Sequence, residues 1–403
     1  MSGRRFRVAH VITRLELGGA QQNTLFCARN HDRARFEVQL IAGGGGRLDG
    51  EARQIPDTAV HLVPYLAHPV SPRHDLQAVL RLREHFLRHR VDLVHTHSSK
   101  AGIVGRIAAH LAGVPALVHT VHGWSFNPTQ PAARRRLYVA LERLAGAISD
   151  RLIVVADGHR ELGLAAGISR RERYAVLRSG IDPQAFVDSR RAPEVVRREL
   201  GFGPEHRVVG MLACLKPQKA PLDFVDAAAV AHARDDRLRF FIAGDGELRE
   251  PLLARIEARG LRGIVLPLGW RDDVADLLHA ADVFLLTSLF EGLPRAVLQA
   301  MAAGTPVVAT AVDGTPEVVE HERTGLLVPP GDPAAAGRAV LRLVGDAELA
   351  RRCAHAARRR LDAEFDIRQM LGKLEGLYME LLCGQCRRST ATARTPARSA
   401  EAG

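Results

Sequence analysis

Two neighbouring lysines in the second half of the chain are the residues best suited to bind an anion. Lys216 and Lys219 stand in Cys214-Leu-Lys-Pro-Gln-Lys219, directly after an apolar run, and the chain has only four lysines among its 56 basic residues. Compact ammonium groups beside the first amides of a helix suit a diphosphate. The alternative interpretation is that both lysines are ordinary solvated surface residues.

A second segment, Glu291-Gly-Leu-Pro-Arg-Ala-Val-Leu-Gln299, combines a carboxylate with the expected start of a helix. Pro294 suits the first turn, where its missing N–H is not needed. The free amides of Arg295 and Ala296 then point at the crevice that we expect at the carboxyl ends of the strands. Glu291 can accept hydrogen bonds from hydroxyls, and Gln299 can reach a second group. By spacing alone, a binding site and a simple capped helix, with its acid near the positive end of the helix dipole, are equally favoured.

The first half offers a glycine pair, Gly18-Gly19, just before an expected helix. Glycines let backbone N–H groups approach an anion closely. The loop lacks the GxGxxG pattern, however, so hydride transfer from a bound dinucleotide loses its main support. A tight turn without a ligand is the alternative interpretation.

Four histidines, His95, His97, His119 and His122, end two expected strands, and we expect them to share one crevice. Their spacing permits a metal site, but no carboxylate or cysteine accompanies them in the sequence. We therefore expect no metal, and we assign most of these histidines to capping or core positions. His122, followed by a glycine, is best placed to face a ligand.

Short β-branched runs alternate with helical patterns along the chain, which predicts parallel sheets covered by helices. The alternation starts again after residue 200, so we expect two α/β units with a boundary near residue 185. The charged stretch 190–199 is predicted to be a linker. The expected strands are 6–12, 36–42, 59–63, 91–96, 116–121, 152–155, 174–177, 207–212, 239–243, 264–268, 283–287, 307–310 and 326–328.

Composition narrows the classes of function. The chain has 403 residues, 46% of them apolar, and carries a formal charge of +11, which suggests a polyanionic partner. Only 5% of residues are aromatic and no basic-aromatic motif appears, so we expect no nucleic-acid partner. Five scattered cysteines and the lack of a signal peptide favour a cytoplasmic location. We expect at most peripheral membrane contact, since no uninterrupted apolar span occurs.

Several motifs together resemble one known family. The segment from Glu291 through Gly304-Thr-Pro-Val-Val-Ala-Thr310, followed by Gly314-Thr-Pro-Glu317, is similar to the donor-binding region of family-4 retaining glycosyltransferases of the GT-B fold. Further matches, in the family's order, are the glycine pair at 18–19, the Thr-x-His segment 120–122, Ser-Gly-Ile-Asp at 179–182, Gly-Asp-Gly-Glu at 244–247 and Gly-Trp-Arg-Asp-Asp at 269–273. The resemblance covers nearly the whole chain.

The resemblance implies an α/β architecture of two Rossmann-like parallel-sheet domains facing an interdomain cleft. The domain expectations are an acceptor-side domain at 1–185, a nucleotide-sugar-binding domain at 186–365, a C-terminal helix at 366–386 that packs back across the domains, and a disordered tail at 387–403.

The resemblance also implies roles for single residues. The catalytic residues would be His122, Lys219 and Glu291, with Glu291 on hydroxyls of the sugar and Lys219 on the diphosphate. Gln299 would hold the ribose, residues 268–271 would border the base, and the glycine pair would line the acceptor side. The substrate-binding residues so implied are Gly18, Gly19, Lys216, Leu268, Trp270, Arg271, Gly292, Leu293, Arg295, Ala296 and Gln299.

Two positions depart from the family pattern. The family commonly has Glu-x7-Glu, but Gln299 stands at the second position and would bind ribose hydroxyls as a neutral group. The family's Gly-Arg-Leu before the phosphate-binding lysine is Ala213-Cys214-Leu215, so the usual arginine is missing. We hypothesise that Lys216 supplies the missing charge.

The expected activity is transfer of a sugar from a nucleotide-diphospho-sugar, with UDP the preferred carrier, to a hydroxyl, with retention and without metal or other cofactor. Basic residues lie beside apolar ones in 73–90 and 134–141, and such surfaces suit contact with anionic lipid at the inner face of a membrane. A solvated helix surface is the alternative there. The resemblance to enzymes of exopolysaccharide and cell-wall assembly implies a lipid-linked or polysaccharide acceptor. The rival functions are a nucleotide-sugar 2-epimerase on the same fold and, more remotely, a non-catalytic nucleic-acid-binding protein.

Overall fold

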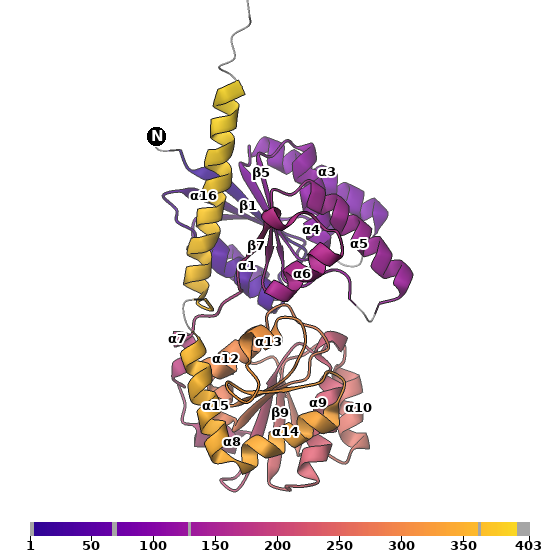
Figure 1. Cartoon of the computed structure of the whole chain (residues 1–403), viewed down its shortest axis with the longest axis vertical. Helices are drawn as coiled ribbons and strands as arrows, with labels where there is room; N and C mark the ends of the chain where they lie inside the picture. The colour runs from indigo at the N-terminus through magenta and orange to yellow at the C-terminus, as the bar shows by residue number, and fades with distance from the viewer. Residues whose placement is uncertain (1–3, 67–70, 128–129, 362–363, 393–403) are drawn as a thin grey trace, which may run out of the picture. The chain divides into compact units, whose positions relative to one another are not determined.

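The computed structural model describes residues 4–66, 71–127, 130–361 and 364–392. The chain divides into two compact units (Figure 1). The N-terminal unit comprises Met1–Val154, Leu162–Leu177 and Leu371–Gly403, and the C-terminal unit comprises Val155–Glu161 and Arg178–Met370. Residues 371–392 therefore belong with the N-terminal unit.

The N-terminal unit is built on a parallel seven-stranded sheet with strand order β3-β2-β1-β4-β5-β6-β7. The order reverses between β1 and β4, and ligands of open α/β sheets bind outside the carboxyl ends of the strands at such a switch point. The strands are β1 (Phe6–Ile12), β2 (Phe36–Ala42), β3 (Thr58–Leu62), β4 (Leu93–His97), β5 (Ala116–Val121), β6 (Arg151–Val154) and β7 (Tyr174–Val176).

Helices connect these parallel strands, as such crossovers require. Helix α4 packs against β1, β4 and β5, with α3 and α5 on its flanks, while the last helix, α16, places Tyr378 beside His95 of β4. The helices of this unit are α1 (Gly19–Asn30), α2 (Asp49–Arg53), η1 (Pro64–Leu66), α3 (Pro72–Arg88), α4 (Ser99–Leu111), α5 (Ala132–Ala147), η2 (Arg171–Arg173) and, extending into the other unit, α6 (Asp157–Ala165) and α16 (Ile367–Thr392).

The C-terminal unit repeats the plan with a parallel six-stranded sheet in the order β10-β9-β8-β11-β12-β13. Its order reverses between β8 and β11. The strands are β8 (Arg207–Leu212), β9 (Leu238–Ala243), β10 (Val265–Gly269), β11 (Val283–Leu286), β12 (Val307–Thr310) and β13 (Leu326–Val328). The helices are α7 (Gln184–Val187), α8 (Pro193–Glu199), η3 (Pro217–Lys219), α9 (Pro221–His232), α10 (Arg249–Ala258), α11 (Val274–Ala280), α12 (Arg295–Ala303), α13 (Thr315–Val318), α14 (Pro333–Gly345) and α15 (Ala347–Arg360).

Strands β4, β5, β11 and β12 are buried along their whole length, because helices cover both faces of a parallel sheet. All four residues of β11 and of β12 are buried, and they pack with α9, α12 and α14 into the main core of the C-terminal unit. The prediction of an α/β fold with two parallel sheets is confirmed.

Two local predictions are wrong. The stretch 190–199 is not a plain linker, because helix α8 begins at Pro193 and buries Val196, while Asp276 fixes the backbone amide of Arg190 at 2.7 Å. The sequence predicts a tail without structure from residue 387, yet α16 continues to Thr392. The remainder of that predicted tail, 393–403, lies outside the described residues.

No helix within the described ranges is both long enough and apolar enough to span a bilayer.

Candidate functional site

The first candidate site lies at the switch point of the C-terminal sheet. Strands β8 and β11 are neighbours, with Val209 opposite Val283, so the loops that leave their carboxyl ends are neighbours too. Ligands of open α/β sheets bind at such points. One loop carries Lys216 and Lys219, and the other carries Glu291. The fold thus brings together two segments that lie 72 residues apart in sequence.

Lys219 and Glu291 form an ion pair, with Nζ 2.5 Å from Oε1. The Glu291 side chain is only 4% exposed and that of Lys219 is 23% exposed, so the pair is shielded from bulk water. Ser288 donates a second hydrogen bond to the same carboxylate oxygen at 2.6 Å. A buried carboxylate needs such partners, since an isolated charge in the interior is costly.

Backbone contacts fasten the two loops to each other. The Leu289 amide donates to the carbonyl of Gln218 at 2.8 Å, and the Gln218 side chain donates to the carbonyl of Phe290 at 2.9 Å. The Thr287 hydroxyl donates to the carbonyl of Ala220 at 3.0 Å. Ala220 itself has φ 43°, a left-handed conformation that costs free energy for a residue with a side chain. The lysine loop is therefore held in place by the end of β11.

The segment Asp313–Glu317 forms another wall of this region. Asp313 accepts a hydrogen bond from the Glu291 amide at 2.8 Å. Gly314 approaches Gly292 so closely that a Cβ would lie 2.2 Å from the Gly292 carbonyl oxygen, which explains why glycine stands there. Glu317 accepts hydrogen bonds from the first amides of α6, at Asp157 and Gly158. Glu317, the glutamate of the Gly-Thr-Pro-Glu motif, therefore caps the start of α6.

His159 is a member of this region that the sequence did not reveal. It is 3% exposed and lies near Glu291, Asp313 and Glu317. Burial lowers its pKa, while the nearby carboxylates act in the opposite direction. Its position in sequence, within a polar stretch of α6, gives no signal of this contact, because residues 155–161 join the C-terminal unit only through the fold.

Other predicted donor-binding residues lie around the same loops. Helix α12 begins at Arg295, with Pro294 at the position just before it, so Arg295 and Ala296 are its first residues as expected. Gln299 follows on α12 and is partly exposed, whereas Gly292 and Leu293 are buried. Lys216 is exposed and directly precedes η3.

Leu268, Trp270 and Arg271 lie at the carboxyl end of β10, two strands away from β8. Arg271 donates to Asp273 at 2.7 Å, and Asp273 also pairs with Arg191. These bonds hold the pKa of the Asp273 carboxyl below its usual value. Arg271 therefore already has a strong partner in a network of charges at this end of the sheet.

The second candidate site lies at the switch point of the N-terminal sheet. Gly18 is the residue just before α1, and Gly19 opens that helix, as the glycine loop predicts. On the neighbouring strands, His97 ends β4 and His122 follows β5. His97 Nδ1 lies 3.2 Å from Nε2 of the half-buried His122.

The expectation that four histidines share one crevice is wrong for His119. Side chains alternate between the faces of a strand, so His95 and His97 lie on one face while His119 lies on the other. There His119 Nδ1 is 2.9 Å from the Thr96 hydroxyl, and its ring fills the space beside Gly102 of α4. Burial lowers the pKa of His119 well below its usual value.

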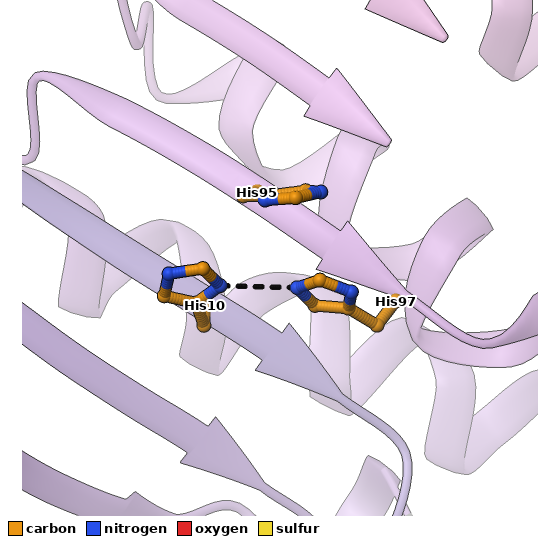
Figure 2. Close-up of side chains that lie close together, drawn as sticks. All are labelled: His10, His95 and His97. Atoms are coloured by element: carbon orange, nitrogen blue, oxygen red, sulfur yellow. Dashed lines mark hydrogen bonds between the residues drawn. The ribbon is translucent and has the colours of Figure 1, made fainter. Parts of the chain in front are cut away.

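The sequence also missed three partners on the histidine face. His10 of β1 lies opposite His95 in register, and Nδ1 of His10 is 3.0 Å from Nε2 of His97 (Figure 2). His31, just after α1, bonds His10, and Tyr378 of α16 bonds His95. No motif marks these residues, since they come from three distant segments.

Two histidine groups in the described part of the chain are close enough to share a metal ion. One is His10, His95 and His97, all buried, and the other is His61, His85 and His89 between β3 and the end of α3. Both nitrogens of His95 already meet hydroxyls, those of Tyr378 and Thr120. His85 bonds Gln39, and its pKa is lowered to about 4 by burial and by the neighbouring His61, His89 and Arg88.

Comparison with known proteins agrees with this architecture. Residues 18–180 match the family described as glycosyl transferase 4-like domain, and residues 194–360 match glycosyl transferases group 1. The chain is 31% identical over 386 residues to the UDP-Gal:α-D-GlcNAc-diphosphoundecaprenol α-1,3-galactosyltransferase of Escherichia coli, covering 94% of this chain and 98% of the relative.

Solved structures show the same fold. HepE of Anabaena, solved with UDP-glucose, superposes with a TM-score of 0.80 at 23% identity and covers 93% of this chain and 100% of its own. Sucrose-phosphate synthase of Thermosynechococcus elongatus gives a TM-score of 0.82 at 20% identity, covering 94% of this chain and 100% of its own.

Two Rossmann-like parallel sheets, each with a switch-point loop region, define the GT-B class of glycosyltransferases. The chain belongs to the glycosyl transferases group 1 family, and its own N-terminal half is a glycosyl transferase 4-like domain. It is a glycosyltransferase.

Proposed function

We propose that this glycosyltransferase moves a sugar from a UDP-sugar to a hydroxyl of a lipid-linked acceptor, with retention of anomeric configuration and without a metal ion. The observation that carries the proposal is the Lys219–Glu291 pair, in which a cation and a carboxylate lie in adjoining loops of one switch point. The Escherichia coli relative is named for a UDP-Gal donor and a GlcNAc-diphosphoundecaprenol acceptor, which supports the choice of both substrate classes.

The proposed donor site holds the diphosphate with Lys219, Lys216 and the amides of Arg295 and Ala296. Cleavage of the sugar–phosphate bond leaves negative charge on the departing diphosphate. Groups that already point at that charge lower the barrier without reorganisation. Because lysines and a helix start supply the positive charge, the proposal needs no metal to stabilise the leaving group.

The remaining donor contacts are assigned from the family resemblance. Glu291 accepts hydrogen bonds from sugar hydroxyls, and Gln299 bonds the ribose hydroxyls as a neutral group. The backbone and side chains at Leu268, Trp270 and Arg271 border the base, while Gly292 and Leu293 line the sugar. His122 contacts the sugar or the attacking hydroxyl, and Gly18-Gly19 lies on the acceptor side.

The proposed acceptor is lipid-linked because the N-terminal unit exposes apolar side chains among arginines. Leu76 and Leu80 of α3 are 61% and 55% exposed, and Leu137 of α5 is 57% exposed. Arg73 and Arg81 flank the first pair, and Arg134–Arg136 precede Leu137. Such surfaces suit an anionic membrane, where leucines enter the interface and arginines meet head groups. We propose peripheral contact with the inner face of the membrane.

The rival on the same fold is a nucleotide-sugar 2-epimerase. Such an isomerase needs acid and base groups beside the sugar and no acceptor. The Escherichia coli relative, matched over nearly its full length, is named as a transferase, which favours transfer.

The discriminating experiment incubates the purified protein with a UDP-sugar, with and without a polyprenyl-diphospho-sugar acceptor, and measures free UDP. The proposal predicts UDP release only when the acceptor is present, with release unaffected by EDTA. Conversion of the UDP-sugar into another sugar without acceptor supports the isomerase instead. A product whose anomeric proton signal shows the configuration opposite to that of the donor overturns retention.

A further inference from the structure

Four histidines of the N-terminal unit form one continuous hydrogen-bonded chain that ends on a carboxylate. His122 Nε2 lies 3.2 Å from His97 Nδ1, and His97 Nε2 lies 3.0 Å from His10 Nδ1. His10 Nε2 lies 3.0 Å from His31 Nε2, and His31 Nδ1 lies 2.9 Å from Oε1 of Glu375. We call these five residues the histidine chain. Figure 2 shows one of its four bonds, between His10 and His97.

The histidine chain connects separate elements of one unit. His10 lies on β1, His97 on β4, His31 directly after α1 and Glu375 on α16. The side chains of His10, His31 and His97 are at most 2% exposed, so water cannot replace the bonds between them. Each interior imidazole uses both of its nitrogens in the histidine chain.

A neutral imidazole has one N–H and one lone pair, so bonding at one nitrogen dictates the role of the other. Burial lowers the pKa of His10 and His97 well below the usual value and also lowers that of His31, which favours the neutral rings. The bond from His31 in turn helps to hold the pKa of Glu375 below its usual value, which favours the carboxylate.

The carboxylate gives the histidine chain a direction. Glu375 Oε1 accepts hydrogen bonds from the backbone amide of Asp32, at 2.9 Å, and from His31. His31 must therefore carry its proton on Nδ1 and a lone pair on Nε2. His10 then donates from Nε2 to His31, His97 donates from Nε2 to His10, and His122 donates from Nε2 to His97.

We propose that Glu375 is a positioning residue that fixes the tautomer of His122, with the proton on Nε2 and the lone pair on Nδ1. Resting on the proposed function, this tautomer lets His122 accept a hydrogen bond from a hydroxyl of the sugar or acceptor. A histidine tautomer is set by the bond that its other nitrogen makes. Here that control passes through three further imidazoles.

The competing assignment for part of this cluster is a metal held by His10, His95 and His97. A metal would take the lone pair of His10 Nδ1, which the histidine chain gives to His97, and would break the alternating order. His95 stands beside the histidine chain rather than in it, since its nitrogens bond Tyr378 and Thr120. The two assignments therefore predict different protonation patterns.

The test is a two-bond proton–nitrogen NMR spectrum of the full-length protein with ¹⁵N-labelled histidine near pH 7.5. Signals are assigned by comparing wild type with single His→Gln variants. The proposal predicts that His31 carries its proton on Nδ1, whereas His10, His97 and His122 carry theirs on Nε2. A proton on Nδ1 of His10 or His97, or a shift of both on adding Zn²⁺, overturns it. This readout requires no activity, so it stands apart from the proposed function.

Two substitutions at Glu375 test whether its hydrogen-bond acceptor, rather than the volume of its side chain, sets the direction of the hydrogen bonds in the histidine chain. The side-chain amide introduced by Glu375→Gln still offers an oxygen to His31 and to the Asp32 amide, so this variant should keep the wild-type tautomers and the wild-type kcat. Glu375→Leu removes the acceptor, so the His10 and His97 signals should become mixed, and kcat should fall on the order of tenfold with KM unchanged. Glu380→Leu is the matched control, because Glu380 lies on the same helix but bonds the half-exposed Arg151. Wild-type tautomers in Glu375→Leu contradict the proposal.

Discussion

The Nζ atom of Lys219 lies 2.5 Å from Oε1 of Glu291, across the two strands where the C-terminal sheet reverses its order. The sequence identifies Lys219 and Glu291 as separate candidate residues, and the fold brings their side chains into contact. In the proposed donor complex, the diphosphate contacts Lys219 and the sugar hydroxyls contact Glu291. The pair therefore holds both side chains in position before the ligand arrives, which reduces the cost of ordering them on binding.

Glu291→Gln should separate recognition of the sugar from recognition of the nucleotide. A neutral amide makes weaker hydrogen bonds to hydroxyls than a carboxylate does, so UDP-sugar affinity should fall about tenfold. UDP affinity should stay the same or rise, because Lys219 loses a competitor for its charge. Isothermal titration with both ligands checks this, with the exposed Glu257→Gln as control. Equal losses for UDP and UDP-sugar would contradict the assigned role.

Lys216→Ala tests the hypothesis that Lys216 replaces the arginine missing from Ala213-Cys214-Leu215. An exposed lysine that contacts a phosphate contributes about 1 kcal/mol, so UDP affinity should fall roughly fivefold. The loss should shrink as salt concentration rises. Unchanged affinity in Lys216→Ala, beside abolished affinity in Lys219→Ala, would show that the compensation hypothesis fails.

Stability should fall steeply below neutral pH. The buried His10, His31, His95, His97 and His119 all have lowered pKa values in the folded protein, chiefly because of burial. The unfolded chain binds protons at these residues below about pH 6.5, while the folded chain does not. Their stabilisation is therefore present above that pH and is lost as pH falls, at up to about 1.4 kcal/mol per pH unit for each histidine.

Urea unfolding measured between pH 8 and pH 5.5 tests this acid sensitivity. His95→Phe should reduce the slope of stability against pH, since it removes one buried titrating group. The exposed His321→Phe should leave the slope unchanged. A free energy of unfolding that stays constant over this range would show that the histidines protonate equally in both states.

Leu76→Asp with Leu80→Asp should weaken binding to vesicles that contain anionic lipid. The change removes two exposed apolar side chains from α3 and adds charge that anionic head groups repel. Co-sedimentation should show at least a threefold loss, with Leu162→Asp on α6 as the control for an added aspartate. Wild-type protein that stays in the supernatant with anionic vesicles at low salt would refute peripheral docking.

Prediction from sequence succeeds where local pattern decides the structure. Short β-branched runs place β1, β2, β5 and β8 with the bounds that the structure shows. The lysine loop and Glu291 stand out because each follows an apolar strand and precedes a helix. Their contact depends on which strands are neighbours, and only the sheet order supplies that information.

The parts that sequence reasoning misses depend on tertiary register. His10 lies inside an apolar run that predicts a buried strand, so the sequence does not mark it. Its contacts with the other histidines arise because β1 pairs with β4 and brings His10 opposite His95. Glu375 and Tyr378 lie on a C-terminal helix that no motif links to the first strands. The expectation for His119 is wrong because side chains alternate between the two faces of a strand. His119 and His122, three residues apart, therefore need not point the same way.

The most direct test of the account is a thermal-shift panel of UDP-, GDP- and ADP-sugars with wild type and Lys219→Ala. A ligand at about one hundred times its Kd adds about 2.7 kcal/mol, which raises Tm by roughly 5–10 °C in domains of this size. We predict this rise for UDP-sugars with wild type and with the exposed-lysine control Lys373→Ala, and little or none with Lys219→Ala. No shift with any sugar nucleotide, or an equal shift in Lys219→Ala, would contradict the claim.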